Sequence, residues 1–169
     1  MRAALAVLLL LPSPGEPAVE VLFAPTGDAR RLQARAAAEL GLARTSVRVA
    51  MFHFTSERLA RALAERARAG VPVRVLLDAR QSDAAFVGRL RGAGIEVRLA
   101  TPRGDEQTRF HHKYSVLDDR IVLSGSYNWT VQGDMSNHEN LVLFRDEAAA
   151  RAFAENFDRT WEDPDLSRP

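Results

Sequence analysis

Apolar and polar residues follow one another along this chain with two different periods, which predict alternating strands and helices. In residues 46–52 the apolar positions alternate and β-branched side chains are frequent, as in a buried or half-buried strand. In residues 57–69 the apolar positions recur at helical spacing. By the same criteria we expect strands at residues 19–23, 72–78, 95–99, 113–117, 120–123 and 140–144, and helices from after residue 28 to about residue 40, at residues 83–91 and at residues 146–161.

Polar residues mark the ends of these elements. Asp28 and Ser56 stand before helical stretches and are expected to cap them. Residues 101–109 are polar and residues 125–137 are rich in Gly, Ser and Asn, so we expect both to be loops. The tail from residue 163 to residue 169 is expected to fray.

The order of elements predicts the fold class. Strand–helix alternation followed by a β-rich half indicates an α/β fold, a mixed sheet covered by helices on both faces. The length of 169 residues fits one domain with a substantial core, and no repeat or linker divides the chain.

Residues 1–18 have the layout of a secretory signal peptide. One arginine precedes nine apolar residues, and a stretch rich in proline and small residues follows. A helix that spans a bilayer takes about 20 residues, so this run is too short; a buried first strand or helix is the alternative. We expect cleavage between residues 15 and 18, and a mature domain of residues 19–169 that is periplasmic or extracellular, without a stable membrane anchor.

Composition narrows the possible chemistry. The net charge is +1, so a surface that binds anions must be local rather than general. The chain has no cysteine, which excludes disulfides, thiolate metal sites and a cysteine nucleophile. No cluster of carboxylates for a two-metal site stands out.

Lysine occurs once among the 23 basic residues, at Lys113, two positions after His111. Alternate residues of a strand share a face, so these two side chains should lie side by side and His112 on the other face. An ammonium group disfavours protonation of a neighbouring imidazole. His111 would therefore stay neutral and nucleophilic near neutral pH, while Lys113 binds a phosphate oxygen. Chance placement of a lone lysine is the alternative.

Two segments downstream complete a candidate site. Gly125 lets the backbone approach an anion closely, and the Ser126 hydroxyl and Asn128 amide add donors two residues apart. Glu139 is expected to accept the second ring N–H of His111 and so fix its tautomer, unless it is an ordinary surface carboxylate.

Other residues near these segments have less specific roles. Arg103 and Arg109 are candidates for contacts with a nucleic-acid backbone. His53 and His138 are candidates for substrate contact, with a structural role as the alternative. Trp129 could stack on a base, although burial beneath the loop is favoured.

These residues fall at the spacing of a known motif. The chain reads His111-x-Lys113-x4-Asp118-x6-Gly125-Ser126-x-Asn128, which resembles the catalytic signature of the phospholipase D superfamily. The motif occurs once, as in the small secreted bacterial endonucleases of that superfamily, and residues 51–56 resemble the first active-site strand of this subgroup. The resemblance implies a phospholipase D-like mixed β-sheet flanked by helices on both faces. Strand parity turns Asp118 away from His111, which favours an orienting or turn-stabilising role for it.

The resemblance also implies a mechanism shared by two subunits of a homodimer. His111 of one subunit would attack phosphorus and form a phosphohistidine, and the partner's His111 would protonate the leaving oxygen and then activate water. Two copies each of Lys113, Ser126 and Asn128 would hold the non-bridging oxygens, and Glu139 matches the carboxylate that binds the nucleophilic histidine. Neither a metal nor another cofactor is expected.

The predicted function is a metal-independent endonuclease with little sequence specificity, acting on DNA and also considered for RNA. A phospholipase D that acts on phospholipid head groups or cardiolipin is the alternative, although the mature chain shows no obvious apolar stretch for a bilayer. A binding protein without catalytic activity would not need the histidine nucleophile. No protein partner other than a second copy is inferred.

Overall fold

Eight strands form one mixed sheet in the order β1-β7-β6-β5-β2-β3-β4-β8. This computed structural model describes residues 17–28, 30–104, 107–163 and 166–168. The strands are β1 (Val19–Ala24), β2 (Val47–Met51), β3 (Val73–Asp78), β4 (Glu96–Ala100), β5 (Lys113–Leu117), β6 (Ile121–Gly125), β7 (Glu139–Arg145) and β8 (Ser167–Arg168). The helices are α1 (Arg31–Leu42), α2 (Glu57–Arg68), α3 (Ala84–Gly92), α4 (Val131–Met135) and α5 (Glu147–Glu162).

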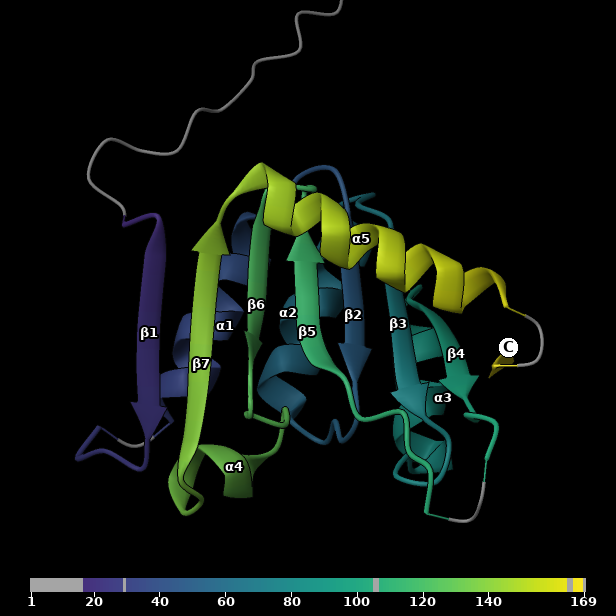
Figure 1. The fold of residues 1–169 in the computed structure, drawn as a ribbon, viewed down its shortest axis with the longest axis horizontal. Helices are drawn as coiled ribbons and strands as arrows, with labels where there is room; N and C mark the ends of the chain where they lie inside the picture. The colour runs from purple at the N-terminus through teal and green to yellow at the C-terminus, as the bar shows by residue number, and fades with distance from the viewer. Residues whose placement is uncertain (1–16, 29, 105–106, 164–165, 169) are drawn as a thin grey trace, which may run out of the picture.

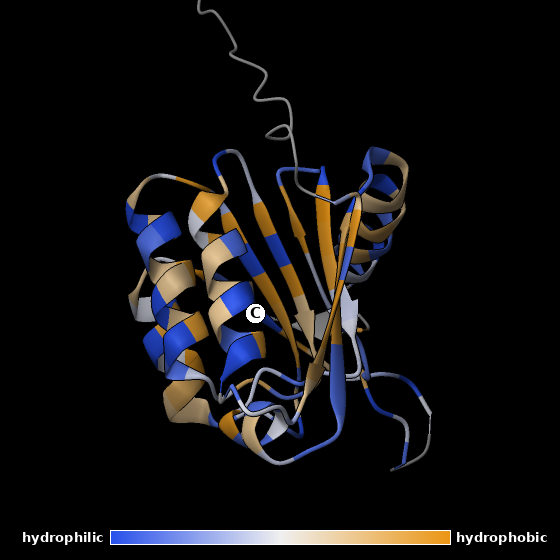
Figure 2. Ribbon diagram, turned by 90° about the vertical axis from the view of Figure 1, so that its left-hand side faces the viewer, coloured by the Kyte–Doolittle hydropathy of each residue, from blue (hydrophilic) through white to orange (hydrophobic). Residues whose placement is uncertain are grey.

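Helices cover both faces of this sheet. Figure 1 shows α5 crossing the near face while α1, α2 and α3 lie behind, and Figure 2 shows the same layers edge-on with apolar strand residues between them. Two separate cores result, one between the sheet and α1–α3, the other beneath α5. The expected α/β fold, a mixed sheet flanked on both faces in a single domain, is confirmed.

The helix starts follow the expected caps with one exception. Ser56 caps α2 by accepting the Leu59 N–H, as predicted. The predicted cap at Asp28 is wrong, because α1 begins at Arg31 and its N-cap side chain makes no capping bond. Instead the carboxylate of Asp134, about a hundred residues away in sequence, accepts the N–H groups of residues 32 and 33 at 2.8 and 3.0 Å. A tertiary contact therefore supplies the anion that the first turn of a helix favours.

Two short elements were not predicted. Helix α4 lies inside the expected loop 125–137 and starts where the Thr130 side chain accepts the Gly133 N–H at 3.0 Å. Strand β8 lies in the tail that was expected to fray and pairs with β4.

The predicted signal peptide falls almost entirely outside the described residues. None of the described helices combines the length and apolarity needed to span a bilayer.

The register of the strands brings five strand ends to one edge of the sheet. Met51 at the end of β2 pairs with Leu77 of β3 and with Lys113 at the start of β5. Gly125 at the end of β6 pairs with Leu141, near the start of β7. This is the lower edge in Figure 1, and α5 crosses the sheet nearer the opposite edge.

Candidate active site

His111 and Lys113 contact each other directly at this lower edge. Lys113 Nζ lies 3.2 Å from Nδ1 and 3.3 Å from Nε2 of His111, and it donates a hydrogen bond to the His111 carbonyl oxygen at 3.0 Å. His111 is exposed, whereas Lys113 is half-buried. The two side chains thus share a face, as strand parity predicts, and the imidazole is open to a ligand.

Phe52, the residue after β2, supports this pair. Its ring lies 4.5 Å from the His111 ring, centroid to centroid, and Lys113 Nζ lies 5.1 Å from the centroid of the Phe52 ring. The Phe52 N–H also donates to the His112 carbonyl oxygen at 2.7 Å. We expected residues 51–56 to lie near the site. The contact of the Phe52 ring with both His111 and Lys113 was not predicted, because it depends on how β2 and β5 pack together.

The surroundings of His111 favour its neutral form. Partial desolvation, and then the positive charge of Lys113, lower the pKa of His111, while the charge of Asp78 acts in the opposite direction. Desolvation also lowers the pKa of Lys113, and the negative charge of Glu139 partly offsets this effect. A neutral imidazole next to an ammonium group is the state that a nucleophilic histidine requires.

Ser126 and Glu139 lie together across the β6–β7 pair. The Ser126 hydroxyl donates a short hydrogen bond to Glu139 Oε2 and accepts the N–H of Asn140 at 3.1 Å. Within the described residues Glu139 makes no hydrogen bond to His111, in contrast to our expectation; its second oxygen accepts from Asn137 Nδ2 at 3.4 Å. Its carboxylate therefore orients the serine and acts on Lys113 through charge.

Gly125 makes the close approach of these two strands possible. Its φ is +145°, and a Cβ at this position would overlap the main-chain and side-chain oxygens of Asn140. Glycine is therefore required where β6 turns into the segment that carries Ser126 and Asn128.

The segment after Ser126 is anchored to the loop that follows β2. The Trp129 side chain is only 2% exposed and packs edge-on against Phe54, and its carbonyl oxygen accepts the N–H groups of Thr55 and Ser56. Trp129 is thus buried rather than available for stacking on a base. Asn128 Oδ1 is buried and accepts no hydrogen bond within the described residues, which leaves a polar atom unmatched beside the candidate site.

Asp118 lies at the opposite end of β5 and does not join the other motif residues. Its carboxylate accepts the main-chain N–H groups of Arg44, Thr45 and Ser46 at 2.7–3.0 Å. Asp118 therefore holds the loop before β2. The motif groups Asp118 with the catalytic residues, but its contacts in this structure are those of the turn-stabilising role that strand parity favoured.

The remaining candidate residues lie close in the chain to residues of the site. His53 follows Phe52 and is half-buried, and His138 is exposed next to Glu139. Arg109 is half-buried two residues before His111 and donates to the Thr108 carbonyl oxygen at 3.0 Å. His112 points away from this pair, with its ring centroid 5.1 Å from that of Phe110 and 5.3 Å from that of Tyr114.

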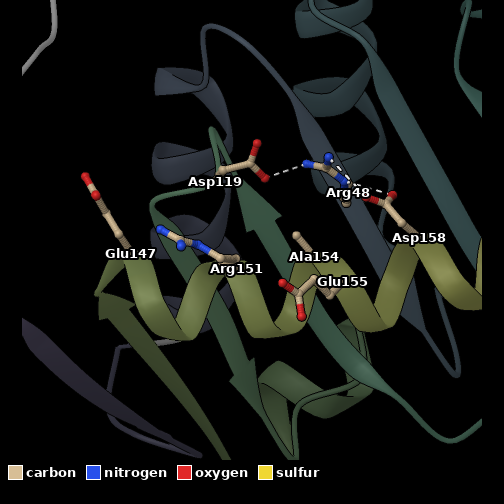
Figure 3. Close-up of a pocket in the computed structure, with 7 residues that line it drawn as sticks. All are labelled: Arg48, Asp119, Glu147, Arg151, Ala154, Glu155 and Asp158. Atoms are coloured by element: carbon tan, nitrogen blue, oxygen red, sulfur yellow. Dashed lines mark hydrogen bonds and ion pairs between the residues drawn. The ribbon is translucent and has the colours of Figure 1, made fainter.

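A cavity of about 340 Å³ beside α5 is separate from this site. Figure 3 shows its lining, in which Arg48 is paired with Asp119 and Asp158 at 2.7 and 3.2 Å. Asp119 belongs to the turn between β5 and β6, at the far end of β5 from Lys113. The described residues contain no group of three or more His, Asp or Glu side chains placed to hold a metal ion.

Comparison with known sequences places most of the chain in one family. Residues 37–161 match the family described as cardiolipin synthase, PLD-like domain. A mitochondrial cardiolipin hydrolase of Xenopus laevis is 40% identical over 125 residues, which are 73% of this chain and 58% of that protein. The chain spans about half the length of the curated relatives that it matches.

Solved structures agree with the fold over nearly the whole chain. The phospholipase D family member Nuc from Salmonella typhimurium superposes with a TM-score of 0.76 and 26% identity, covering 90% of this chain and 97% of Nuc. NucT from Helicobacter pylori gives a TM-score of 0.75 at 22% identity, covering 85% of this chain and 96% of NucT, a likeness that concerns the fold alone.

Proposed function

We propose that this chain, which belongs to the phospholipase D superfamily, is a phosphodiester hydrolase, and specifically a metal-independent endonuclease that cleaves nucleic acid. The observation that carries the proposal is the contact between Lys113 and both ring nitrogens of an exposed His111, whose pKa is lowered by desolvation and by the charge of Lys113. This pair offers a nucleophile and a fixed positive charge at one place, and the exposed edge can admit a polymer.

The proposed reaction proceeds in two steps. An imidazole nitrogen of His111 attacks phosphorus, so that a P–N bond forms as the bond from phosphorus to the leaving oxygen breaks, and the partner's His111, which starts protonated, gives its proton to that oxygen. Water then attacks phosphorus and loses its proton to the partner's His111 while the P–N bond breaks. A phosphate monoester leaves, and both histidines return to their starting states.

Electrostatic stabilisation comes from side chains in this proposal. Lys113 and Asn128 hold the non-bridging oxygens as charge builds up on them, together with the Ser126 hydroxyl. Glu139 fixes that hydroxyl and keeps Lys113 charged through its own negative charge. Gly125 lets the phosphate approach the backbone, and Arg109 and His53 contact the polymer on either side.

A second copy of the chain completes the proposed site, because one chain carries one His111 and the reaction uses two. The exposure of His111 and Ser126 at the sheet edge is compatible with such a partner.

We further propose that residues 1–18 direct export to the periplasm or the medium. Recovery of protein beginning between residues 16 and 19 from that fraction would support this part, and recovery of only the full-length chain in the cell would contradict it.

Cardiolipin or another phospholipid is the second candidate substrate. Relatives that are up to 40% identical carry the name mitochondrial cardiolipin hydrolase. In addition, Val19, Val21 and Phe23 are 49–62% exposed along β1, although the sequence showed no obvious apolar surface. Phe23 pairs with Asn140, so this apolar strip begins beside the site and would suit contact with a lipid surface.

One set of assays separates the two substrates. Plasmid DNA, RNA and cardiolipin vesicles are incubated in EDTA with the wild-type protein and with His111→Ala. We expect nicking of the plasmid by the wild type only. Hydrolysis of cardiolipin without cleavage of DNA or RNA would favour the second candidate, and loss of all activity in EDTA would contradict the metal-free mechanism.

A further inference from the structure

Asp78, the last residue of β3, is a buried carboxylate beside the candidate site. It is 1% exposed. One oxygen, Oδ1, accepts the N–H groups of Arg80 and Gln81 at 3.0 and 3.1 Å, which closes the turn after the strand. The other oxygen, Oδ2, accepts the N–H of Phe110 at 2.8 Å. The second contact crosses from β3 to the segment that carries His111.

That segment depends on such contacts because it precedes the regular part of β5. Residues 109–112 are not in a strand, and β5 begins only at Lys113. The chain enters this region from the loop after β4 and passes the end of β3 before joining β5, as Figure 1 shows. Without ladder bonds, the backbone around His111 must be fixed in another way.

Hydrogen bonds hold this backbone on each side of the histidine. Asp78 holds the N–H of Phe110, the residue before His111, and the Phe52 N–H binds the carbonyl oxygen of His112, the residue after it. The buried Phe110 side chain adds packing on the same side. A hydrogen bond to a carboxylate is among the stronger ones, and a carboxylate this deeply buried strongly disfavours a change that leaves it without partners.

We propose that Asp78 is a positioning residue for the reaction, because its carboxylate fixes the backbone on the N-terminal side of His111 and thereby the direction from which the imidazole reaches phosphorus. The proposal rests on the proposed function, in which His111 is the nucleophile. Misplacement of a reacting group by about 1 Å lowers a rate by as much as ~100-fold.

Asp78 also acts on His111 through its charge. Desolvation and then the charge of Lys113 lower the pKa of His111, whereas the charge of Asp78 raises it. The ring of His112, the next residue in the chain, packs against Phe110 and Tyr114 instead. Removal of the Asp78 charge should lower the pKa of His111 further. The acid limb of the profile of kcat/KM against pH should then move to lower pH.

The test compares Asp78→Asn with Asp118→Asn. In Asp78→Asn the new amide can keep its carbonyl toward the turn at residues 80 and 81, but its NH₂ donor then faces the Phe110 N–H. Asp118 is the matched control, because its carboxylate also accepts backbone N–H groups before a strand, at the opposite edge of the sheet. We expect both variants to lower the melting temperature. Only Asp78→Asn should lower kcat, by about 10- to 100-fold with KM little changed, and shift the acid limb.

Several outcomes would overturn the proposal. It fails if folded Asp78→Asn keeps the wild-type kcat and pH profile, or if Asp118→Asn lowers kcat as much. If Asp78→Asn does not fold, Asp78→Glu and Asp118→Glu replace the pair with the same expected contrast in kcat. His111→Ala is assayed in parallel. Activity in that variant would contradict the proposed function itself. An inactive His111→Ala together with normal activity of Asp78→Asn would contradict only the positioning role of Asp78.

Discussion

Lys113 contacts His111 through its Nζ atom alone, and only a lysine side chain offers this geometry. Its Nζ lies within 3.3 Å of both ring nitrogens and donates to the carbonyl oxygen of the same residue. An arginine would bring a planar group with several nitrogens into a space bounded by the Phe52 ring. Charge alone is therefore not sufficient at this position.

We expect Lys113→Arg to retain the fold and to lower kcat by a factor of about 100 or more, because a planar fork cannot take the place of a compact ammonium at the phosphate. Steady-state hydrolysis of a chromogenic phosphodiester measures the effect, and the melting temperature reports the fold. Arg61→Lys, an exchange between the same residue types on the exposed part of α2, is the control and should leave both values unchanged. Near-normal turnover by Lys113→Arg would mean that the lone lysine has no special role.

The pKa of His111 can be tested without turnover. Lys113 lowers this pKa because its positive charge opposes a second one on the imidazole. Lys113→Met removes the charge and keeps an unbranched side chain, so the pKa of His111 should rise toward its ordinary value. Titration of the ring C–H resonances by NMR measures the shift, and His53→Gln assigns one of the other histidine signals. An unchanged or lower pKa in Lys113→Met would contradict the electrostatic argument.

For contacts between individual residues, the sequence predicted those that follow from the alternation of side chains along a strand. It could not predict contacts that depend on the path of a loop. The shared face of His111 and Lys113 needs only the period of a strand. The hydrogen bond from Ser126 to Glu139, in contrast, depends on how the chain returns from β6 to β7 through α4, which local sequence does not determine. The role of Asp78 was missed for the same reason, since its partner Phe110 is 32 positions away.

Among the secondary-structure elements, the edge strand β1 is fixed to the molecule by buried charge. Glu39 of α1 is 1% exposed and accepts hydrogen bonds from Arg35 and from Arg145 of β7, itself only 5% exposed. Arg35 also binds Glu20 of β1 at 2.9 Å. This network joins α1, β1 and β7 at the end of β7 that lies opposite Glu139.

Glu39→Gln should therefore lower the free energy of unfolding by about 3 kcal/mol, since it removes the buried negative charge that Arg35 and Arg145 share. Urea unfolding followed by circular dichroism measures this value. Glu57→Gln is the control: its ion pair with Arg89 is exposed on both sides and should contribute less than about 1 kcal/mol. Equal effects of the two substitutions would show that burial of the Glu39 network does not matter for stability.

Element boundaries were predicted where the signal is local. Ser56 caps α2 through a residue three positions ahead, so its polar side chain was sufficient. The start of α1 was misplaced because its capping anion, Asp134, comes from the other half of the chain. Helix α4 has only five residues and a glycine inside it, so the Gly- and Ser-rich composition hid it.

For the whole molecule, the topology explains why a single motif forms only half of the proposed site. The sheet gathers Lys113, Gly125 and Glu139 at one edge, next to the one histidine of the motif, whereas the proposed reaction uses two such histidines. A two-fold axis near this edge would bring the partner's His111 to the same phosphate, since a symmetric dimer presents the same surface twice. The class of fold was predictable from element order, whereas this axis is not encoded in any local pattern.

Mixed dimers test this symmetry directly. Wild-type protein and His111→Ala, each with a different affinity tag, are unfolded together and refolded, and the doubly tagged species is purified. If one site uses a histidine from each subunit, the mixed dimer should have less than about 1% of wild-type turnover, because neither subunit can replace the missing acid or nucleophile. Two independent sites would leave the mixed dimer with about half of the activity. As a control, wild type carrying both tags and refolded in the same way should regain full activity, so that any loss is due to the missing imidazole. A fully active monomer in light scattering at assay concentration would contradict the shared site altogether.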